Sequence, residues 1–239
     1  MNAPAPAQRV LAISGTSRGL GRGIAAHFAA HGWKVAGCSR SEADLGIENY
    51  THTVVDATDE AQVRRWVRGI KQQHGRIDAV VCNIGLVKSA LLLPMMPTEL
   101  FQQFFDTSLK ATFLVCREVA KVMMLQRAGR IVTIGSTMTV VHEPGTAAYS
   151  ANKAGIVEMT KVMARELAPQ GITCNVVSPS LVTTEASDAM GADWRERILA
   201  LQTIKRPVEI AEVCAVIDFF LAPDSGCITG QVLHTCMVS

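Results

Sequence analysis

The chain of 239 residues carries 23 Lys and Arg against 21 Asp and Glu, which gives a formal net charge of +2. This near-neutral balance excludes the strong positive field that gathers nucleic acid or anionic membranes. Hydrophobic residues form 49% of the chain and charged residues only 18%, which excludes intrinsic disorder.

Seven short apolar runs alternate with longer stretches of helical periodicity. Such alternation predicts βαβ units, a parallel sheet and helices on both of its faces. We find no composition shift and no internal repeat, so one doubly wound α/β domain is expected over residues 1–239. The expected strands are Val10–Ile13, Lys34–Cys38, His52–Val55, Ala79–Cys82, Arg130–Ile134, Ile172–Val177 and Val232–His234.

Three further segments carry distinct expectations. Ala148–Leu167 is expected to be one long helix that ends before Pro169. Pro97–Gln126 is expected to be helical with an interruption near Lys110. Residues 183–204 break the regular alternation and are expected to form a small helical lid over the substrate.

Signals for targeting and for metal binding are not found in the sequence. Residues 1–8 are rich in Ala and Pro, are expected to be flexible, and lack the basic start and apolar core of a signal peptide. No apolar run is long enough to span a membrane, so a cytoplasmic protein is expected. The seven cysteines form no CxxC pair, which favours reduced thiols over disulfides, and no metal site is expected.

A glycine-rich loop, Ser14–Gly21, follows the first expected strand and opens a helix. In this context Gly15 permits a tight turn, Gly19 allows the backbone to approach a pyrophosphate, and Gly21 allows close packing of helix and sheet. The N–H groups at the start of the helix would bind the phosphates. A plain turn is the alternative.

The end of the second strand bears on the choice of dinucleotide. A carboxylate there would bind the ribose 2′-hydroxyl of NAD, but this chain has Ser39 and Arg40 instead. Arg40, together with Arg18 in the glycine loop, suits a 2′-phosphate through charge-assisted hydrogen bonds. NADP(H) is therefore expected, with two solvated surface arginines as the alternative.

Tyr149, Lys153 and Ser136 form a candidate catalytic group. Tyr149 and Lys153 are four residues apart on one expected helix and share a face. A free phenol has a pKa near 10, and a nearby ammonium lowers it. Ser136 ends the fifth strand, so the three side chains could bind a carbonyl and give it a proton while a nicotinamide delivers hydride. A packed Tyr beside a surface Lys is the alternative.

Over essentially its whole length, the sequence resembles the short-chain dehydrogenase/reductase family. The motifs that carry the resemblance are Ser14–Gly21, Asp56, Asn83-Ile84-Gly85, Ser136, Tyr149-Ser150-Ala151-Asn152-Lys153 and Asn175-Val176-Val177-Ser178-Pro179. The resemblance implies a Rossmann fold with a seven-stranded parallel sheet and, usually, a tetramer.

The resemblance also implies cofactor contacts. Asp56 would bind the adenine amino group, Asn83 the fourth strand and the adenine ribose, and Lys153 the nicotinamide ribose. Two structural alternatives remain open: Asp56 could be the N-cap of the next helix, and Asn83 could be a turn residue. The implied set is Gly15, Ser17, Arg18, Gly19, Leu20, Gly21, Ser39, Arg40, Asp56, Ala57, Asn83, Ile84, Gly85, Tyr149, Lys153, Pro179, Val182 and Thr184.

The 3-oxoacyl-(acyl-carrier-protein) reductases are the most similar branch, through the runs Gly129–Ser136 and Ile228–Gly230. Arg127 matches a basic position that docks the acidic carrier in such enzymes, but the second basic position is Gln170. A free ketone or a CoA thioester therefore stays open as substrate. Arg127 as a cation at a helix C-terminus is the structural alternative.

The chain departs from the family pattern at several positions. Ser108 stands where an Asn usually holds a relay water, and Ile84 replaces a usual Ala where the cofactor passes. Ser180 replaces the Gly after Pro179, near the nicotinamide, and the usual Asp-Gly-Gly close to the C-terminus is absent. Ser108 is counted with the catalytic group. The expected substrate-facing residues are Ser136, Met138, His142, Tyr149, Ser180 and Met190.

These observations predict an NADPH-dependent ketoreductase that acts on a ketone, with a 3-oxoacyl thioester of acyl carrier protein or CoA as the expected substrate. The alternatives are an alcohol dehydrogenase or ketone reductase of secondary metabolism, and a weakly active partner subunit of a hetero-oligomeric reductase. A homotetramer or homodimer is expected, and neither nucleic acid nor membrane is an expected partner.

Overall fold

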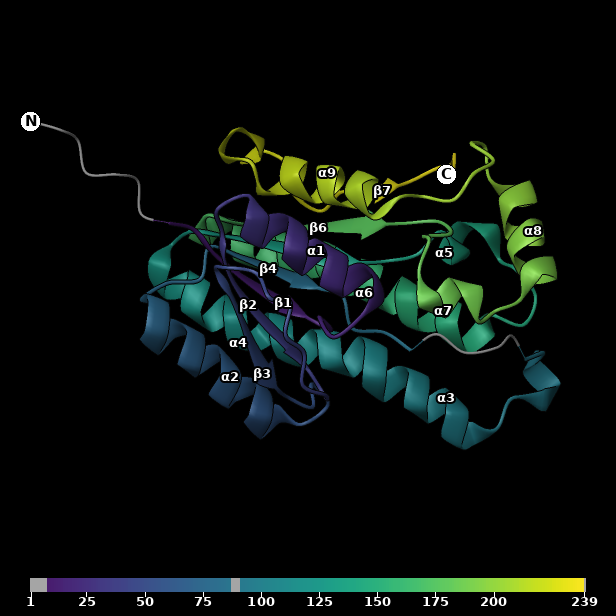
Figure 1. Cartoon of the computed structure of the whole chain (residues 1–239), viewed down its shortest axis with the longest axis horizontal. Coiled ribbons are helices and arrows are strands. Elements are labelled where there is room, and N and C mark those ends of the chain that lie inside the picture. The colour runs from purple at the N-terminus through teal and green to yellow at the C-terminus, as the bar shows by residue number, and fades with distance from the viewer. Residues whose placement is uncertain (1–7, 87–90, 239) are drawn as a thin grey trace, which may run out of the picture.

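The computed structural model of the chain describes residues 8–86 and 91–238. Among them, seven parallel strands pair in the order β3-β2-β1-β4-β5-β6-β7 (Figure 1). The order reverses between β1 and β4, the position where α/β sheets bind ligands beyond their carboxyl ends. The strands are β1 Val10–Ser14, β2 Lys34–Ser39, β3 Tyr50–Val54, β4 Ala79–Cys82, β5 Gly129–Ile134, β6 Ile172–Ser178 and β7 Val232–His234.

Helices cover both faces of this sheet. The α-helices are α1 Gly19–Ala30, α2 Glu60–His74, α3 Thr98–Phe104, α4 Ala111–Gln126, α5 Met138–Val141, α6 Ala147–Leu167, α7 Glu185–Asp188, α8 Ala192–Leu201 and α9 Ile210–Leu221. Short 3₁₀ turns are η1 Leu93–Met95, η3 Ala168–Gln170 and η4 Pro223–Ser225, and η2 Phe105–Lys110 is π-helical.

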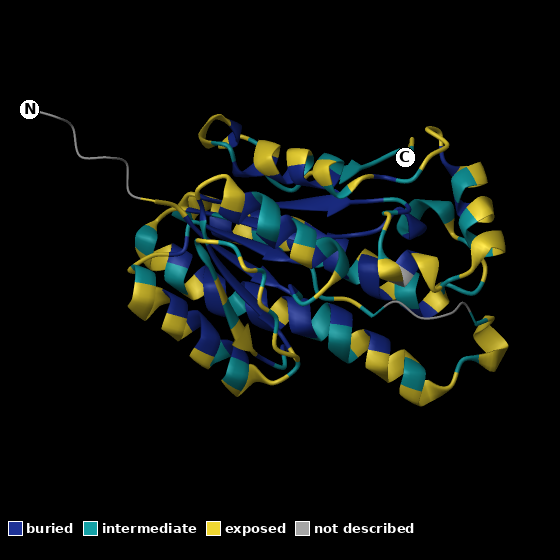
Figure 2. Cartoon of the chain, viewed as in Figure 1, coloured by how far each residue is buried: buried dark blue, intermediate teal, exposed yellow. Residues whose placement is uncertain are grey.

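The core consists of two apolar layers, one on each side of the sheet. Along β1, Val10 and Ala12 pack towards α2, α4 and α6, whereas Leu11 and Ile13 pack towards α1 and α9. All five β1 residues are buried, as expected for a strand covered on both faces. Figure 2 shows this buried sheet between helices whose outer faces are exposed. The α/β, doubly wound fold predicted from the sequence is confirmed.

The expected element bounds agree with the structure to within two residues, apart from one feature. β3 begins at Tyr50 rather than at His52, and α6 begins at Ala147. The interruption expected near Lys110 is not a break: the chain passes from α3 into the π-helical turn η2, which ends at Lys110, and on into α4. A π turn absorbs the irregular spacing without ending the helix, and such turns often mark functional sites.

The N-terminal expectation falls partly outside the described residues, since only Gln8 of residues 1–8 is described, and its amide donates a hydrogen bond to the Gly32 carbonyl. All seven cysteines are free thiols, five of them buried. Among the described residues, no helix has the length and apolar character needed to cross a bilayer. No cluster of three or more His, Cys, Asp or Glu side chains suited to a metal ion is found within residues 8–86 and 91–238.

Candidate active site

The glycine loop connects β1 to α1 at the carboxyl edge of the sheet. Gly15 has φ +80° and Gly19 has φ +55°, conformations that residues with side chains rarely adopt. A Cβ atom on Gly21 would lie 2.0 Å from the Gly15 carbonyl oxygen and 2.4 Å from Nδ2 of Asn83. That Nδ2 donates a hydrogen bond to the same oxygen at 3.2 Å, which fastens the end of β4 to the loop.

We expect Gly21→Ala to destabilise the fold by about 2 kcal/mol, as overpacking usually does. The reason is that Gly15 and Asn83 must both move away from the added Cβ atom. Urea denaturation measures this change. Gly69→Ala is the matched control, since it lies on the exposed surface of α2 and no atom lies within 4 Å of the added Cβ. Unchanged stability of Gly21→Ala would contradict the close packing.

The first turn of α1 lies beside this loop and has no side-chain cap. Arg18 is the N-cap residue, no side chain caps the helix, and the first turn holds no acidic residue. The amide groups of that turn are therefore available to phosphate oxygens. A Cβ atom on Gly19 would meet nothing closer than Thr184 at 3.8 Å, so the loop leaves space for a pyrophosphate. The residues present fit a bound dinucleotide.

The other predicted residues around this loop divide by exposure. Ser17 is half-buried, and Leu20 packs against the apolar layer that contains α1. Ser39 is buried at the end of β2, whereas Arg18 and Arg40 are exposed.

Ser136, Tyr149 and Lys153 meet at the end of β5 and the start of α6. Ser136 is 7% exposed, and its side chain hydrogen-bonds with that of Tyr149. Lys153 lies one helical turn after Tyr149, is 4% exposed, and places Nζ 5.9 Å from the centre of the Tyr149 ring. The structure therefore assembles the three side chains that the sequence singled out.

Burial controls the charge states of two of these groups. It raises the pKa of Tyr149 from its ordinary value of 10.0, and the hydrogen bond with Ser136 lowers it by less. Burial lowers the pKa of Lys153 from 10.5 to about 8, and Nζ donates a hydrogen bond to the Ile134 carbonyl at 2.7 Å. The pKa of Tyr149 is therefore raised overall in the free chain, and the expected lowering of that pKa by Lys153 stays a prediction.

Ser108 lies in the π-helical turn η2 and is buried next to this group. Its Oγ accepts a hydrogen bond from the Leu86 amide at 3.3 Å. A Cβ atom on Gly85 would lie 3.5 Å from Lys153 Nζ and 3.9 Å from Ser108 Oγ. Gly85, Ser108 and Lys153 therefore lie close together, at the position where the family resemblance implies a relay water.

The segment after β6 is held by the lid. The hydroxyl of Ser180 donates a hydrogen bond to Oε1 of Gln202 at 2.6 Å, so the Ser180 side chain is bound to the lid. Gln202 is 2% exposed, and its amide also bonds the Leu181 N–H at 3.3 Å and the carbonyls of Ile204 and Arg206 at 2.8 and 2.7 Å. A fully bonded buried amide of this kind fixes one stem of the lid to the site.

The two ends of the lid are joined at a second point, next to the contacts of Gln202. Val182 forms a parallel bridge with Val208, and Thr184 caps α7 through reciprocal hydrogen bonds with Ser187. Pro179 is buried, and its carbonyl accepts from the Thr137 amide at 3.2 Å. The base of the lid is thus fixed at both ends, with α7 and α8 between them.

An apolar cluster connects the lid to the catalytic group. Met138, Leu181 and Ile198 form its buried centre, and Val141, Tyr149, Trp194 and Leu199 pack against it. Met138 is therefore part of the packing between α5 and α8, while His142 is exposed at φ +58° and Met190 is half-buried. Arg197 of the lid pairs with Glu143, beside His142, at 3.3 Å.

The chain is similar in sequence to known proteins over most of its length. Residues 15–236 match the profile of a family described as "Enoyl-(Acyl carrier protein) reductase". The 3-oxoacyl-[acyl-carrier-protein] reductase FabG of Salmonella typhimurium is 34% identical over 232 residues, which cover 95% of each chain. The chain belongs to the short-chain dehydrogenase/reductase family. It is therefore an oxidoreductase.

Solved structures of short-chain dehydrogenase/reductases have the same fold. ElxO with NADP bound superposes with a TM-score of 0.89 at 26% identity and covers 95% of this chain and 96% of its own. An actinorhodin polyketide ketoreductase variant with NADPH has a TM-score of 0.89 at 27% identity, with 96% of each chain covered. The Rossmann-type sheet expected from the resemblance is confirmed.

At the turn between β3 and α2, one alternative left open by the sequence is wrong. The N-cap of α2 is Asp59, whose side chain accepts from the amides of Ala61 and Gln62, and not Asp56. Asp56 Oδ1 instead accepts from the amide and hydroxyl of Thr58, at 2.9 and 2.8 Å. Ala57 is buried beside it. Asp56 thus shapes the turn that the resemblance assigns to adenine.

The two positions compared with the carrier-docking residues lie side by side. Arg127 is exposed and caps α4 with φ +54°, and its guanidinium donates to Oε1 of Gln170 and to the Pro169 carbonyl, both at 3.5 Å. The charge at this surface therefore comes from Arg127, and Gln170 adds hydrogen-bonding capacity without charge.

Two sets of contacts escaped sequence reasoning, one in the lid and one beside the glycine loop. Gln202 carries no pattern, because nothing local shows that an amide inside a lid will be buried and fully bonded. Tyr50 and His52 lie on β3, where alternation could have placed them on one face, but their contact with the glycine loop depends on the pairing of three strands.

Proposed function

We propose that this protein is an NADP(H)-dependent ketoreductase that reduces a 3-oxoacyl thioester to the secondary alcohol. The observation that carries the proposal is the hydrogen-bonded pair of Ser136 and Tyr149, with Lys153 one turn away, at the sheet edge where α1 begins. Two neighbouring hydroxyl groups suit a carbonyl oxygen, which accepts two hydrogen bonds and takes a proton.

The chain's own residues divide the work of this reaction. Ser136 holds the carbonyl oxygen, and the Tyr149 hydroxyl donates its proton to that oxygen. Lys153 holds the nicotinamide ribose, and Ser108 binds a water through which the Tyr149 proton is replaced. When bound, NADPH supplies a hydride at the nicotinamide. The lid and the cluster around Met138 exclude bulk water from the reacting carbonyl.

NADP(H) is the proposed cofactor because two arginines lie free at the adenosine end. The side chains of Arg18 and Arg40 make no hydrogen bond or ion pair with the described residues and are exposed, so both are available to a 2′-phosphate. The two solved relatives with bound cofactor hold NADP and NADPH.

The thioester substrate is proposed on the printed activity of the relatives and on the surface around Arg127. The family profile is named for enoyl reduction, which instead places a proton on carbon. We favour the ketone because the neighbouring hydroxyl groups of Ser136 and Tyr149 suit a carbonyl oxygen that takes a proton. Acetoacetyl and crotonyl thioesters therefore separate the two chemistries.

The proposal includes a cytoplasmic homotetramer or homodimer. Large apolar side chains are exposed on the outer surfaces of the helices, and they offer an interface between copies. These include Phe105, Phe113 and Leu125 on the η2–α4 helix and Val162 on α6. In the alternative hetero-oligomer, the second chain would bind to the same surface.

The deciding experiment follows the loss of reduced-nicotinamide absorbance with purified protein. The substrates are acetoacetyl and crotonyl thioesters on CoA and on acyl carrier protein, each with NADPH and with NADH. We expect turnover of the acetoacetyl thioesters with NADPH. Tight NADPH binding without thioester turnover would shift the function to an unrelated ketone, and failure to bind either cofactor would favour the partner-subunit alternative.

We expect Arg127→Glu to raise KM for the carrier-linked substrate about tenfold, since reversing a rim charge weakens association with an acidic partner. KM for the CoA thioester should stay the same. Arg68→Glu on the exposed surface of α2 is the matched control. An equal KM increase for both thioesters would contradict docking at Arg127.

A further inference from the structure

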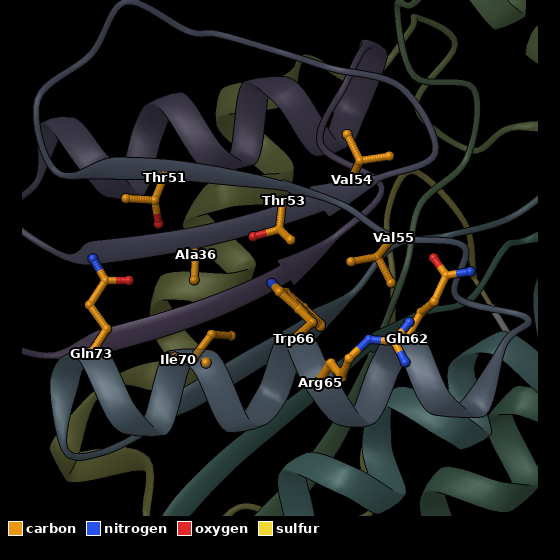
Figure 3. Close-up of a pocket in the computed structure, with 11 residues that line it drawn as sticks. Ala36, Thr51, Thr53, Val54, Val55, Gln62, Arg65, Trp66, Ile70 and Gln73 are labelled. Carbon is orange, nitrogen blue, oxygen red and sulfur yellow. The ribbon is translucent and has the colours of Figure 1, made fainter.

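The edge strand β3 presents different side chains on its two faces. Thr51 and Thr53 line a groove of about 270 Å³ against α2, together with Trp66 (Figure 3). Tyr50 packs on the opposite side, in the apolar layer that contains α1. His52 lies two residues further along and shares that side, because side chains alternate along a strand.

Both ring nitrogens of His52 are engaged. Nε2 lies 3.0 Å from the Ser41 carbonyl oxygen and 3.1 Å from Ser39 Oγ. Nδ1 lies 2.8 Å from the Tyr50 hydroxyl and 3.3 Å from Thr16 Oγ1. A carbonyl oxygen only accepts, so Nε2 carries the hydrogen that is donated to Ser41.

This ring joins two segments that belong to the proposed cofactor site. Thr16 is in the glycine loop two residues before Arg18, and Ser39 and Ser41 flank Arg40. The Tyr50 hydroxyl oxygen and Thr16 Oγ1 lie 2.9 Å apart, which closes the network.

Gly37 provides the room for this network between β1 and β3. A Cβ atom on Gly37 would lie 2.5 Å from the Tyr50 hydroxyl and 2.6 Å from Thr16 Oγ1. A larger residue there would therefore force the Tyr50 and Thr16 hydroxyl groups away from each other.

We propose that His52 is a positioning residue for the 2′-phosphate of NADP(H): it fixes the turn Ser39–Ser41 against the glycine loop so that Arg40 and Arg18 face the same anion. This inference rests on the proposed NADP(H) function. Both arginines have long exposed side chains, and ordering them on binding has an entropic cost. Fixing the backbone of Arg40 beforehand removes part of that cost. His52 thus strengthens binding of the 2′-phosphate without touching the nicotinamide.

The test is calorimetric titration of the full chain with 2′,5′-ADP and with 5′-AMP, which differ only in the 2′-phosphate. We expect His52→Ala to weaken 2′,5′-ADP about tenfold, the effect of roughly one hydrogen-bonded contact, and to change 5′-AMP less than about twofold. His52→Gln retains a donor at the level of Nε2 and should restore most of the affinity, whereas the shorter His52→Asn should not.

Thr53→Val on the other face of β3 is the matched control and should bind both nucleotides as wild type does. In steady-state assays, His52→Ala should raise KM for NADPH about tenfold with kcat and KM for NADH unchanged. Circular dichroism checks that each variant folds. If His52→Ala does not fold, Tyr50→Phe takes its place in the titrations, because it removes the hydroxyl group beside Nδ1 of His52.

Equal weakening of 2′,5′-ADP and 5′-AMP by His52→Ala would overturn the proposal, since His52 would then support the whole nucleotide site. Unchanged affinity for 2′,5′-ADP would overturn it as well. A wild-type chain that binds 5′-AMP as tightly as 2′,5′-ADP would remove the NADP(H) preference itself. That last failure belongs to the proposed function and is visible before any variant is made.

Discussion

Replacing Tyr149 with Phe is expected to lower kcat/KM for ketone reduction by about 10²- to 10⁴-fold, the usual contribution of a positioned general acid. The change removes only the hydroxyl group that is hydrogen-bonded to Ser136. The ring keeps its edge contact with Phe104, whose centre lies 6.4 Å away, so the fold and the cofactor site should persist. Single-turnover reduction and NADPH titration measure the two effects separately.

The charge state of Tyr149 adds a pH dependence to this expectation. Because burial raises its pKa, the free protein keeps the phenol protonated at neutral pH, ready to donate in reduction. Oxidation of the alcohol needs the phenolate, so its rate should still be rising at pH 9 to 10. A Tyr149→Phe protein with more than about a tenth of the wild-type kcat/KM would place the acid elsewhere.

Replacing Lys153 with Met is expected to stabilise the fold by about 2 kcal/mol at pH 7 and to lower kcat/KM by at least about 10²-fold. Lowering the pKa from 10.5 to about 8 corresponds to about 3 kcal/mol for holding the ammonium in a buried site. Loss of the hydrogen bond to the Ile134 carbonyl offsets about 1 kcal/mol of that gain. We expect activity to fall because the nicotinamide ribose would lose the partner proposed for it.

The stability difference between wild type and Lys153→Met should depend on pH in one direction. Below about pH 8, Lys153 is charged in both the folded and the unfolded chain, and the full cost of burying its ammonium group is present. Between pH 8 and 10.5 the unfolded chain binds more protons, so wild-type stability rises and the difference shrinks. Urea denaturation at pH 7 and at pH 10 measures this.

Lys161→Met provides the control for that comparison. Lys161 is exposed on the same helix and pairs with Glu158, so its replacement should change stability by less than about 0.5 kcal/mol at either pH. A Lys153→Met protein that is less stable than wild type at pH 7 would show that the Ile134 hydrogen bond outweighs burial.

The sequence by itself determined the sheet and the candidate catalytic group. Continuous apolar runs such as Val10–Ile13 are buried on both faces, and alternation with helices leaves few possible topologies. Ser136, Tyr149 and Lys153 were recognisable because one helical turn separates the last two and a strand end carries the first. Such spacings are local, and the geometry of a helix places residues four positions apart on the same face.

Only the tertiary structure decided how those groups are tuned and held. The pKa directions of Tyr149 and Lys153 depend on burial, which is a property of everything packed around them. The contacts of Gln202 with Ser180, and of His52 with Thr16, join residues 22 and 36 positions apart. No periodicity encodes such contacts, because strand pairing and lid closure create them only after the chain has folded.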